Sequence, residues 1–283
     1  MIKIRYELFI ITCITNMHVG SGEISFGAVD NLVQRDPVTY LPTINGSSLK
    51  GAIREFFEQQ NFNSGFIEFV FGSSPHSSST QKAGNYKFFS ANLISIPVRS
   101  NKKPFFMATS PYLIGEFLSD IERFEIKLDD TLKNNLNQLK EIPVSKKTPM
   151  VFERLDGDLY IEELKAEVFN SKVSIPRDIF GDNLALLHHD DLKEICADLP
   201  VVARNYLEDG KSQNLWYEEI VPRQTRFYFV VGRPETEENK HFDEFVSAVT
   251  KNLVQIGANA TIGYGYTKIS HINRRGENYE KAG

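Results

Sequence analysis

The chain has 283 residues, of which 41% are hydrophobic, and a formal net charge of −5. That length allows one large or two small domains with a substantial core. No apolar run approaches the roughly 20 residues that cross a bilayer, and the alternating start does not resemble a signal peptide. An acidic total argues against a nucleic-acid-binding protein, although local basic clusters matter more than the sum.

The cysteine pattern argues for a chain that works in the cytoplasm. Cys13 and Cys196 are far apart in the sequence and match no zinc or redox spacing. We therefore expect buried thiols in a reducing cytosol rather than a disulfide.

Apolar residues at every second position predict a strand over 2–14. After it, Ser47 or Ser48 is expected to cap a helix whose apolar residues recur at helical spacing. A short strand is predicted over 93–98. Ser110 precedes a proline, which is the typical order of an N-cap and a first helical residue, so a second helix is predicted there.

Two Asp-Gly pairs predict hairpins in the second half of the chain. The first hairpin is centred on 156–157 and the second on 209–210. A buried strand is predicted over 227–231, and an amphipathic helix over 242–253 follows it. A glycine-rich loop and a last strand then close the predicted order of elements.

Strand–helix–strand units at both ends, with hairpins between them, predict an α+β fold. The expected type is ferredoxin-like, with helices on one face of the sheet and a large insertion. The Ser/Pro/Gln-rich run at 73–81 and the tail after Arg274 are expected to be mobile.

Two glycine-containing turns after the first predicted strand suit a phosphate chain. The first, His18-Val19-Gly20-Ser21-Gly22, precedes the loop residue Asp30; the second, Gly46-Ser47-Ser48-Leu49-Lys50-Gly51, opens the helix that carries Arg54. Free backbone N–H groups beside a Lys and an Arg can bind phosphate. The spacing is neither that of a Walker A loop nor that of a dinucleotide fingerprint, which favours a polynucleotide backbone.

These turns, with a late glycine-rich loop, resemble the RAMP superfamily of CRISPR proteins. Within it, the resemblance narrows to the repeated backbone subunits of type III-B (Cmr) effector complexes and covers residue 3 to about 270. Further segments in the order of that family are Val29-Asp30, Gln34-Arg35, Leu41-Pro42, Phe71-Gly72, Thr109-Ser110-Pro111, Leu215-Trp216-Tyr217-Glu218-Glu219 and Gln255-Ile256-Gly257. Ala258 and Ala260 depart from it, because the family usually has a glycine and an acidic residue there.

The resemblance implies a single RAMP domain over 1–283 with a ferredoxin-like, RRM-like palm. The palm is expected over about 1–124 and 217–272, and a flexible tail over about 273–283. Insertions and a thumb hairpin are expected over about 125–216, with the thumb at about 203–216.

The resemblance also implies a subunit that stacks head-to-tail along a CRISPR guide RNA. Each copy is expected to cut complementary target RNA at regular intervals, and its thumb is expected to displace one base pair of the guide–target duplex. The implied partners are the guide RNA, the target RNA, further copies of the chain and other Cmr subunits, with no membrane.

The resemblance marks Asp30 as the catalytic residue; without it, Asp30 is a turn-forming surface residue. A carboxylate there can orient or deprotonate the ribose 2′-OH, or hold a divalent metal ion, for which we expect Mg²⁺, near the phosphate. His18 is a candidate general acid or RNA contact, or else a loop histidine bonded to the backbone. Glu218 is a candidate second acidic group, or else a strand-end charge.

Nine residues are candidates for RNA binding. They are Ser47, Ser48, Lys50, Arg54, Tyr206, Leu207, Gly257, Gly263 and Gly265. Lys50 and Arg54 stand one helical turn apart and can reach one run of phosphates. The two thumb residues offer apolar bulk beside a base pair, whereas the glycines permit close approach of RNA or serve only the conformation of their loop.

Three other functions remain open from the sequence. One is a non-catalytic RNA-binding backbone subunit, another is the equivalent type III-A (Csm) backbone nuclease, and the third is a stand-alone enzyme that processes guide precursors. Asp30 and the segment Trp216-Tyr217-Glu218-Glu219 argue against the first. The same segment and Gln255-Ile256-Gly257 favour type III-B over type III-A.

Overall fold

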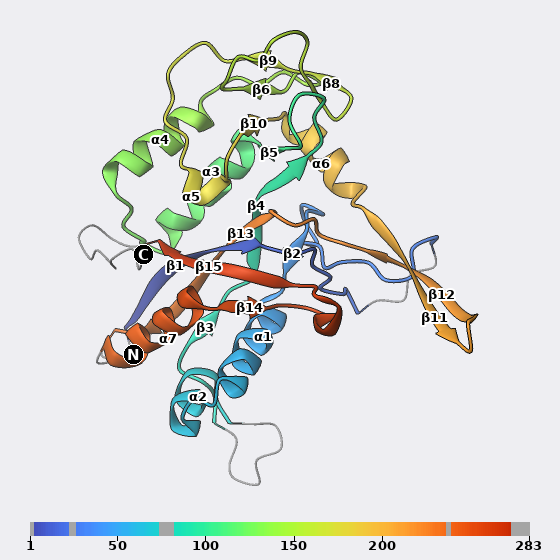
Figure 1. Ribbon diagram of the computed structural model, residues 1–283. Helices are drawn as coiled ribbons and strands as arrows, with labels where there is room; N and C mark the ends of the chain where they lie inside the picture. Colours follow the sequence, from blue (N-terminus) through green and yellow to red (C-terminus); the bar gives the residue numbers. More distant parts are fainter. Residues whose placement is uncertain (1–2, 23–26, 74–81, 236–238, 273–283) are drawn as a thin grey trace.

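The computed structural model describes residues 3–22, 27–73, 82–235 and 239–272 (Figure 1). The stretches at 74–81 and 273–283, where we expected mobility, lie outside the described residues. Among the described residues, no helix combines the length and the apolar character that a bilayer crossing requires.

Four long strands form what we call the palm sheet. In spatial order they are β15 (Tyr266–Ile272), β1 (Ile4–Cys13), β13 (Arg226–Pro234) and β4 (Ala91–Val98), and all neighbours are antiparallel. Along the chain, helix α1 (Gly46–Gln59) comes after β1, and helix α7 (Asn239–Lys251) comes after β13. The order is that of a ferredoxin-like βαββαβ unit, so the predicted α+β palm fold is confirmed.

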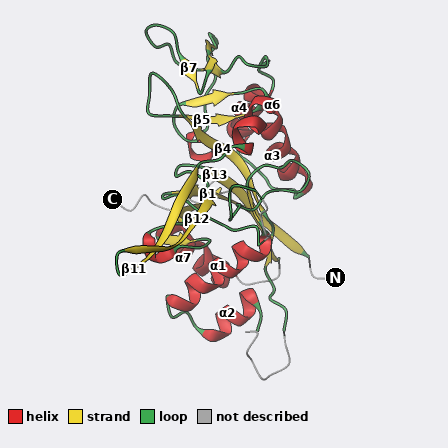
Figure 2. Ribbon diagram, turned by 90° about the vertical axis from the view of Figure 1, so that its right-hand side faces the viewer, coloured by secondary structure: helices red, strands yellow, loops and turns green. Residues whose placement is uncertain are grey.

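Helices cover both faces of the palm sheet, so our expectation of helices on one face was wrong. Side chains alternate along a strand, and in β1 Phe9 and Ile11 join the core beneath α1 and α7. Leu8 and Ile10 join a second core with α3 (Pro111–Arg123) and α4 (Asp130–Lys140). Figure 2 shows these two groups of helices at separate ends of the molecule. A strand that is apolar on both faces requires cover on both.

Beyond β4, the sheet continues into the insertion. The extension is formed by β5 (Phe106–Thr109), β10 (Leu184–Leu186), β6 (Met150–Val151) and β9 (Glu167–Val168), in that order. Other elements are β2 (Thr43–Ile44), α2 (Ser64–Phe71), β3 (Lys87–Phe88), β7 (Tyr160–Ile161), β8 (Leu164–Lys165), α5 (Arg177–Phe180), β14 (Leu253–Gln255) and a 3-10 turn (Ala260–Ile262).

The prediction of a hairpin around 156–157 is wrong. Strand β6, which precedes this turn, pairs with β10 and β9 instead of with the strand that follows. Val151 is fully buried there, so the sheet extension offers it more apolar contact than a local hairpin would. The hairpin in this region lies further on, where β7 pairs with β8.

The hairpin predicted around 209–210 is confirmed, and we call it the thumb hairpin. It consists of β11 (Val201–Glu208) and β12 (Lys211–Glu219), paired antiparallel. Asp209 and Gly210 both have positive φ, of 50° and 75°, as a type I′ turn requires. The hairpin projects from the body in Figure 1 and lies in front of it in Figure 2.

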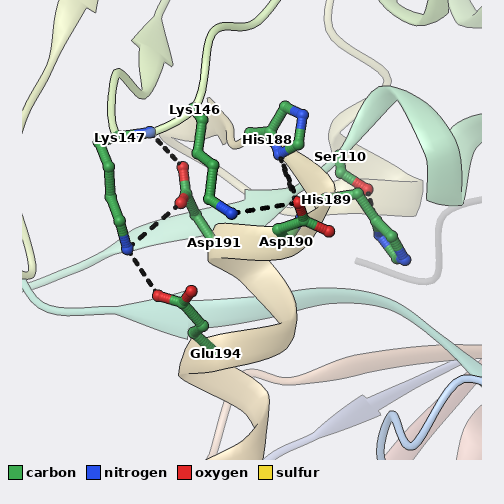
Figure 3. Close-up of polar contacts among 8 residues, drawn as sticks. All are labelled: Ser110, Lys146, Lys147, His188, His189, Asp190, Asp191 and Glu194. Atoms are coloured by element: carbon green, nitrogen blue, oxygen red, sulfur yellow. Dashed lines mark hydrogen bonds and ion pairs between the residues drawn. The ribbon is translucent and has the colours of Figure 1, made fainter.

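Helix α6 (His189–Ala197), which leads into the thumb hairpin, is clamped to the loop at 145–148. Lys147 Nζ lies 3.4 Å from Asp191 Oδ1 and 2.6 Å from Glu194 Oε2. The backbone N–H of Lys147 also donates to the Asp191 carboxylate (Figure 3). Because the chain passes from α6 almost directly into β11, this clamp fixes where the thumb hairpin begins.

The helix starts differ in how well the sequence predicted them. Ser110 accepts a hydrogen bond from the backbone N–H of Leu113 and caps α3, as expected. Helix α1 starts after Asn45, which makes no capping side-chain bond, so neither Ser47 nor Ser48 is its cap. Those two serines lie inside the first turn, because the helix already begins at Gly46.

We expect Phe57→Ala to lower the free energy of unfolding by about 3–5 kcal/mol. Phe57 is fully buried and its ring contacts those of Phe66, Phe71 and Phe245, so truncation leaves a cavity. Urea denaturation measures the loss. The control is Leu253→Ala, whose side chain is 51% exposed and should cost less than about 0.5 kcal/mol; equal losses would contradict the packing argument.

Candidate functional site

Asp30 lies where the loop after β1 meets the root of the thumb hairpin. Its backbone N–H donates to the carbonyl of Tyr217 at 3.0 Å, and its Oδ2 accepts from the Tyr217 N–H at 2.7 Å. Asp30 is nevertheless exposed. This arrangement fixes the carboxylate against one strand and leaves the second oxygen, Oδ1, outside that contact.

His18 is buried at the centre of the same region. Its Nδ1 lies 2.7 Å from the carbonyl oxygen of Glu219, and since a carbonyl only accepts, Nδ1 carries the proton. The His18 carbonyl accepts from the Ala258 N–H at 2.8 Å. A Cβ at Gly20 would lie 3.3 Å from His18 Nε2, so the glycine leaves that nitrogen uncrowded.

Glu218 is buried and accepts three hydrogen bonds. Its donors are Trp216 Nε1 at 2.8 Å, Asn259 Nδ2 at 2.9 Å and Arg204 Nε at 3.1 Å. Burial by itself would raise the pKa of Glu218, but the bonds from Trp216 and Arg204 and the nearby charges of His18 and Arg204 hold it below its ordinary value. Both carboxylate oxygens are occupied, so Glu218 joins the thumb hairpin to the loop around Asn259.

Glu219 and Arg35 form a buried ion pair that the sequence did not predict. Arg35 Nη2 lies 2.5 Å from Glu219 Oε1, and the two side chains are only 8% and 6% exposed. Glu219 also accepts from the Val33 N–H, and Arg35 donates to the carbonyl of Cys196 at the end of α6. Two successive acidic residues on a strand point to opposite faces, and that was the available signal that each would need its own partner.

The glycine-rich loop owes its glycines mainly to conformation. Gly257, Gly263 and Gly265 all have positive φ. A Cβ at Gly257 would come within 2.4 Å of the His18 carbonyl, and one at Gly265 within 2.0 Å of the Ile256 carbonyl. At Gly263 nothing lies within 4 Å, so it is the one of these three glycines where a side chain would find open space.

The predicted basic pair divides into two roles. Arg54 bonds to Glu58 Oε1 at 2.8 Å and to the carbonyl of Gly72 at 3.1 Å, so it fastens α1 to the end of α2. Lys50 is half-buried, and burial, followed by the charges of Arg54 and Lys87, lowers its pKa. Among the described residues, no carboxylate pairs with Lys50.

The other predicted RNA contacts lie at two places. Ser47 and Ser48 begin α1 beside the site, and Ser48 Oγ accepts from Gln34 Nε2 at 2.9 Å. The same Gln34 amide donates to the Gly20 carbonyl. Tyr206 and Leu207 are 55% and 58% exposed on the thumb hairpin, beside its bulge.

The structure thus brings Asp30, His18 and Glu218 to the root of the thumb hairpin. In the part of the chain that the structure describes, no three His, Cys, Asp or Glu side chains are grouped to hold a metal ion. One exposed carboxylate fits the way in which Mg²⁺ is bound by one or two carboxylates together with substrate phosphates and water.

Comparison with known proteins shows the family. Residues 10–268 match the RAMP superfamily. The chain belongs to the RAMP superfamily. Its palm sheet, with helices between the strands, is therefore the RAMP palm, and Asp30 and His18 lie in the loop after the first strand of that palm.

Several proteins similar to this chain over most of its length are Cmr proteins. The chain is 28% identical to "CRISPR system Cmr endoribonuclease Cmr4" of Pyrococcus furiosus, with 91% of this chain and 92% of that protein covered. It is 25% identical to "CRISPR system CMR subunit Cmr4" of Saccharolobus solfataricus, over 94% and 96%. A chain of the type III-B Cmr-beta apo structure superposes with a TM-score of 0.73 at 26% identity, over 95% and 97%.

We expect Glu218→Gln to lower the free energy of unfolding by about 2 kcal/mol at pH 7, because it weakens hydrogen bonds to a buried charge. The pKa of Glu218 is lowered from 4.5 in the folded chain, so its contribution is present above that value and is lost as the pH falls through the folded pKa. Urea titrations at several pH values should show the deficit shrinking below pH 4.5.

The control for this variant is Glu208→Gln, at an exposed position of the thumb hairpin. It should unfold like the wild type at each pH. A Glu218→Gln deficit that stays constant down to acidic pH would mean that shape, rather than the charge of Glu218, stabilises the thumb root.

Proposed function

We propose that this chain is a backbone subunit of a type III-B CRISPR ribonucleoprotein and cleaves guide-matched target RNA at Asp30. The main support is that an exposed carboxylate is fixed against the root of a projecting hairpin on a RAMP palm. Near-complete coverage by relatives named as Cmr4, one of them as an endoribonuclease, supports the assignment.

The chemistry that suits one carboxylate is attack by the neighbouring ribose hydroxyl. Asp30 accepts the proton of the 2′-OH as that oxygen bonds to the adjacent phosphorus. The bond from phosphorus to the 5′-oxygen breaks, and this oxygen takes a proton from a general acid or water. The products are a 2′,3′-cyclic phosphate and a 5′-hydroxyl, so atoms and charge balance without an oxidant or reductant.

His18 and Glu218 support this reaction in different ways. Because His18 Nδ1–H is bonded to the Glu219 carbonyl, Nε2 is the nitrogen that would give or take a proton. Glu218 is saturated by three donors, so we assign it the positioning of the thumb root rather than proton transfer.

A divalent ion fits as a component of the loaded site. Asp30 Oδ1 is the protein oxygen that would hold Mg²⁺, with RNA phosphate and water as the other ligands. Bound there, the ion would stabilise negative charge on the phosphate.

The thumb hairpin gives the cuts their spacing. Its exposed apolar residues, Tyr206 and Leu207, would lie beside a base pair of the guide–target duplex. Copies stacked head-to-tail use two different surfaces of one protein, so the assembly stays open and extends along the guide. One Asp30 per copy then produces cuts at the repeat distance of the assembly.

We expect Asp30→Asn to reduce cleavage of guide-matched target RNA by about 10²–10⁴-fold. The asparagine oxygen can still accept from the Tyr217 N–H, so guide and target binding should survive. The assay uses the assembled complex and analyses the 3′ ends of the products; chelation of divalent ions should also stop cleavage.

Asp36→Asn is the matched control, because Asp36 lies in the same loop and only caps the turn at 38–39. That variant should cut at the normal rate. Full-rate cutting by the Asp30→Asn complex would remove Asp30 from the mechanism, and products that end in a 3′-hydroxyl would exclude attack by the 2′-OH.

Shortening the thumb hairpin at Asp209-Gly210 should blur the regular spacing of target cuts while the palm stays folded. Gel analysis of a long guide-matched target would show this directly. Asp209→Asn is the control, because Asn-Gly also forms a type I′ turn. Sharp, evenly spaced cuts from the shortened variant would show that another segment sets the spacing.

A further inference from the structure

A pocket of about 690 Å³ lies between the start of α1, the end of α2 and strand β3. Three lysines line it: Lys50 from α1, Lys82 from the segment after α2, and Lys87 from β3. Its other walls are largely aromatic, with Phe71, Tyr86, Phe88 and Phe89 as the rings. None of the described acidic residues lines the pocket, so its electrostatic character is positive.

Among the described residues, only one of the three lysines in this pocket pairs with a carboxylate. Lys87 Nζ donates to the Gly84 carbonyl at 3.1 Å, and no carboxylate of the described residues pairs with it or with Lys50. Lys82 has a distant and exposed pairing with Glu68, at 3.7 Å. Like charges beside aromatic walls repel more strongly than in water, and an anion in the pocket would relieve that repulsion.

Backbone contacts hold the walls of the pocket together. Ser73 N–H donates to the Lys82 carbonyl and Lys82 N–H donates to Ser73 Oγ, both at 2.9 Å. A Cβ at Gly84 would come within 2.4 Å of the Val70 carbonyl, so backbone packs directly on backbone there. A site that is already formed loses little conformational entropy on binding.

Helix α1 links the pocket to the region of the candidate cleavage site. Gln34 bonds to Gly20, Ser48 and Asn45, so the first turn of α1 adjoins the loop of His18. The N–H groups of Ser47 and Ser48 have no acceptor within the helix, as in any first turn. Lys50 follows within one further turn and reaches the pocket.

We propose that Lys50, Lys82 and Lys87 form a phosphate-binding pocket for an RNA strand that passes the cleavage site. This inference rests on the proposed function and assigns two lysines that the sequence did not single out. The ligand is the sugar-phosphate backbone, so sequence preference is not expected. Both the guide and the target carry this chemistry, and the experiment below separates them.

The test compares Lys87→Ala, Lys50→Ala and the control Lys133→Ala in the complex. Lys133 is exposed on α4, on the opposite face of the palm sheet. One arm measures binding of guide RNA across salt concentrations, and the other measures target RNA binding to the guide-loaded complex. In one arm, we expect the slope of the logarithm of the binding constant against the logarithm of the salt concentration to become shallower by about 0.7 for each pocket variant. For Lys133→Ala the slope should stay unchanged.

A reduced slope in the guide arm assigns the pocket to the guide, and one in the target arm assigns it to the target. Unchanged slopes for Lys87→Ala in both arms would overturn the pocket while leaving cleavage at Asp30 intact. An equal fall for Lys133→Ala would also overturn it, because general surface charge would then suffice. Wild-type chain that binds neither RNA would refute the pocket and the proposed function together.

Discussion

The burial of two successive carboxylates at the root of the thumb hairpin organises this protein. Glu218 and Glu219 point to opposite sides of β12, and a buried charge is costly unless it is paired. Glu218 is therefore joined to Arg204 and to the glycine-rich loop, and Glu219 to Arg35 in the loop after β1. These pairs fix the thumb hairpin to the palm at the place where Asp30 lies.

The polar side chains around these ion pairs are of two kinds: buried ones that hold segments together, and an exposed one. The buried groups of the site, His18, Glu218 and Glu219, are each bonded to another segment of the chain. Asp30 is held through the backbone of Tyr217 and stays exposed. A carboxylate that is to reach a substrate must stay accessible, whereas its support gains strength from burial, because a low dielectric strengthens paired charges.

The negative net charge of the chain is compatible with its proposed binding of RNA because the charged side chains are distributed unevenly. Acidic side chains in the clamp around Lys147 neutralise that lysine. Lys50 and Lys87 have no such partner among the described residues. A net charge of −5 therefore says little about the surface beside α1, where basic groups alone line a pocket.

The sequence by itself determined the elements whose signal is local. Apolar alternation placed β1, the Asp-Gly turn placed the thumb hairpin, Ser110 with its following proline started α3, and ordered short motifs indicated the RAMP family. Tertiary structure decided what depends on long-range packing. It gave β6 its partners in the sheet extension, covered the second face of the palm sheet, and committed Arg54 to Glu58 and the end of α2. It also paired Arg35 with Glu219, which are 184 residues apart, because a buried charge takes whichever partner the fold brings near, and no local pattern records that choice.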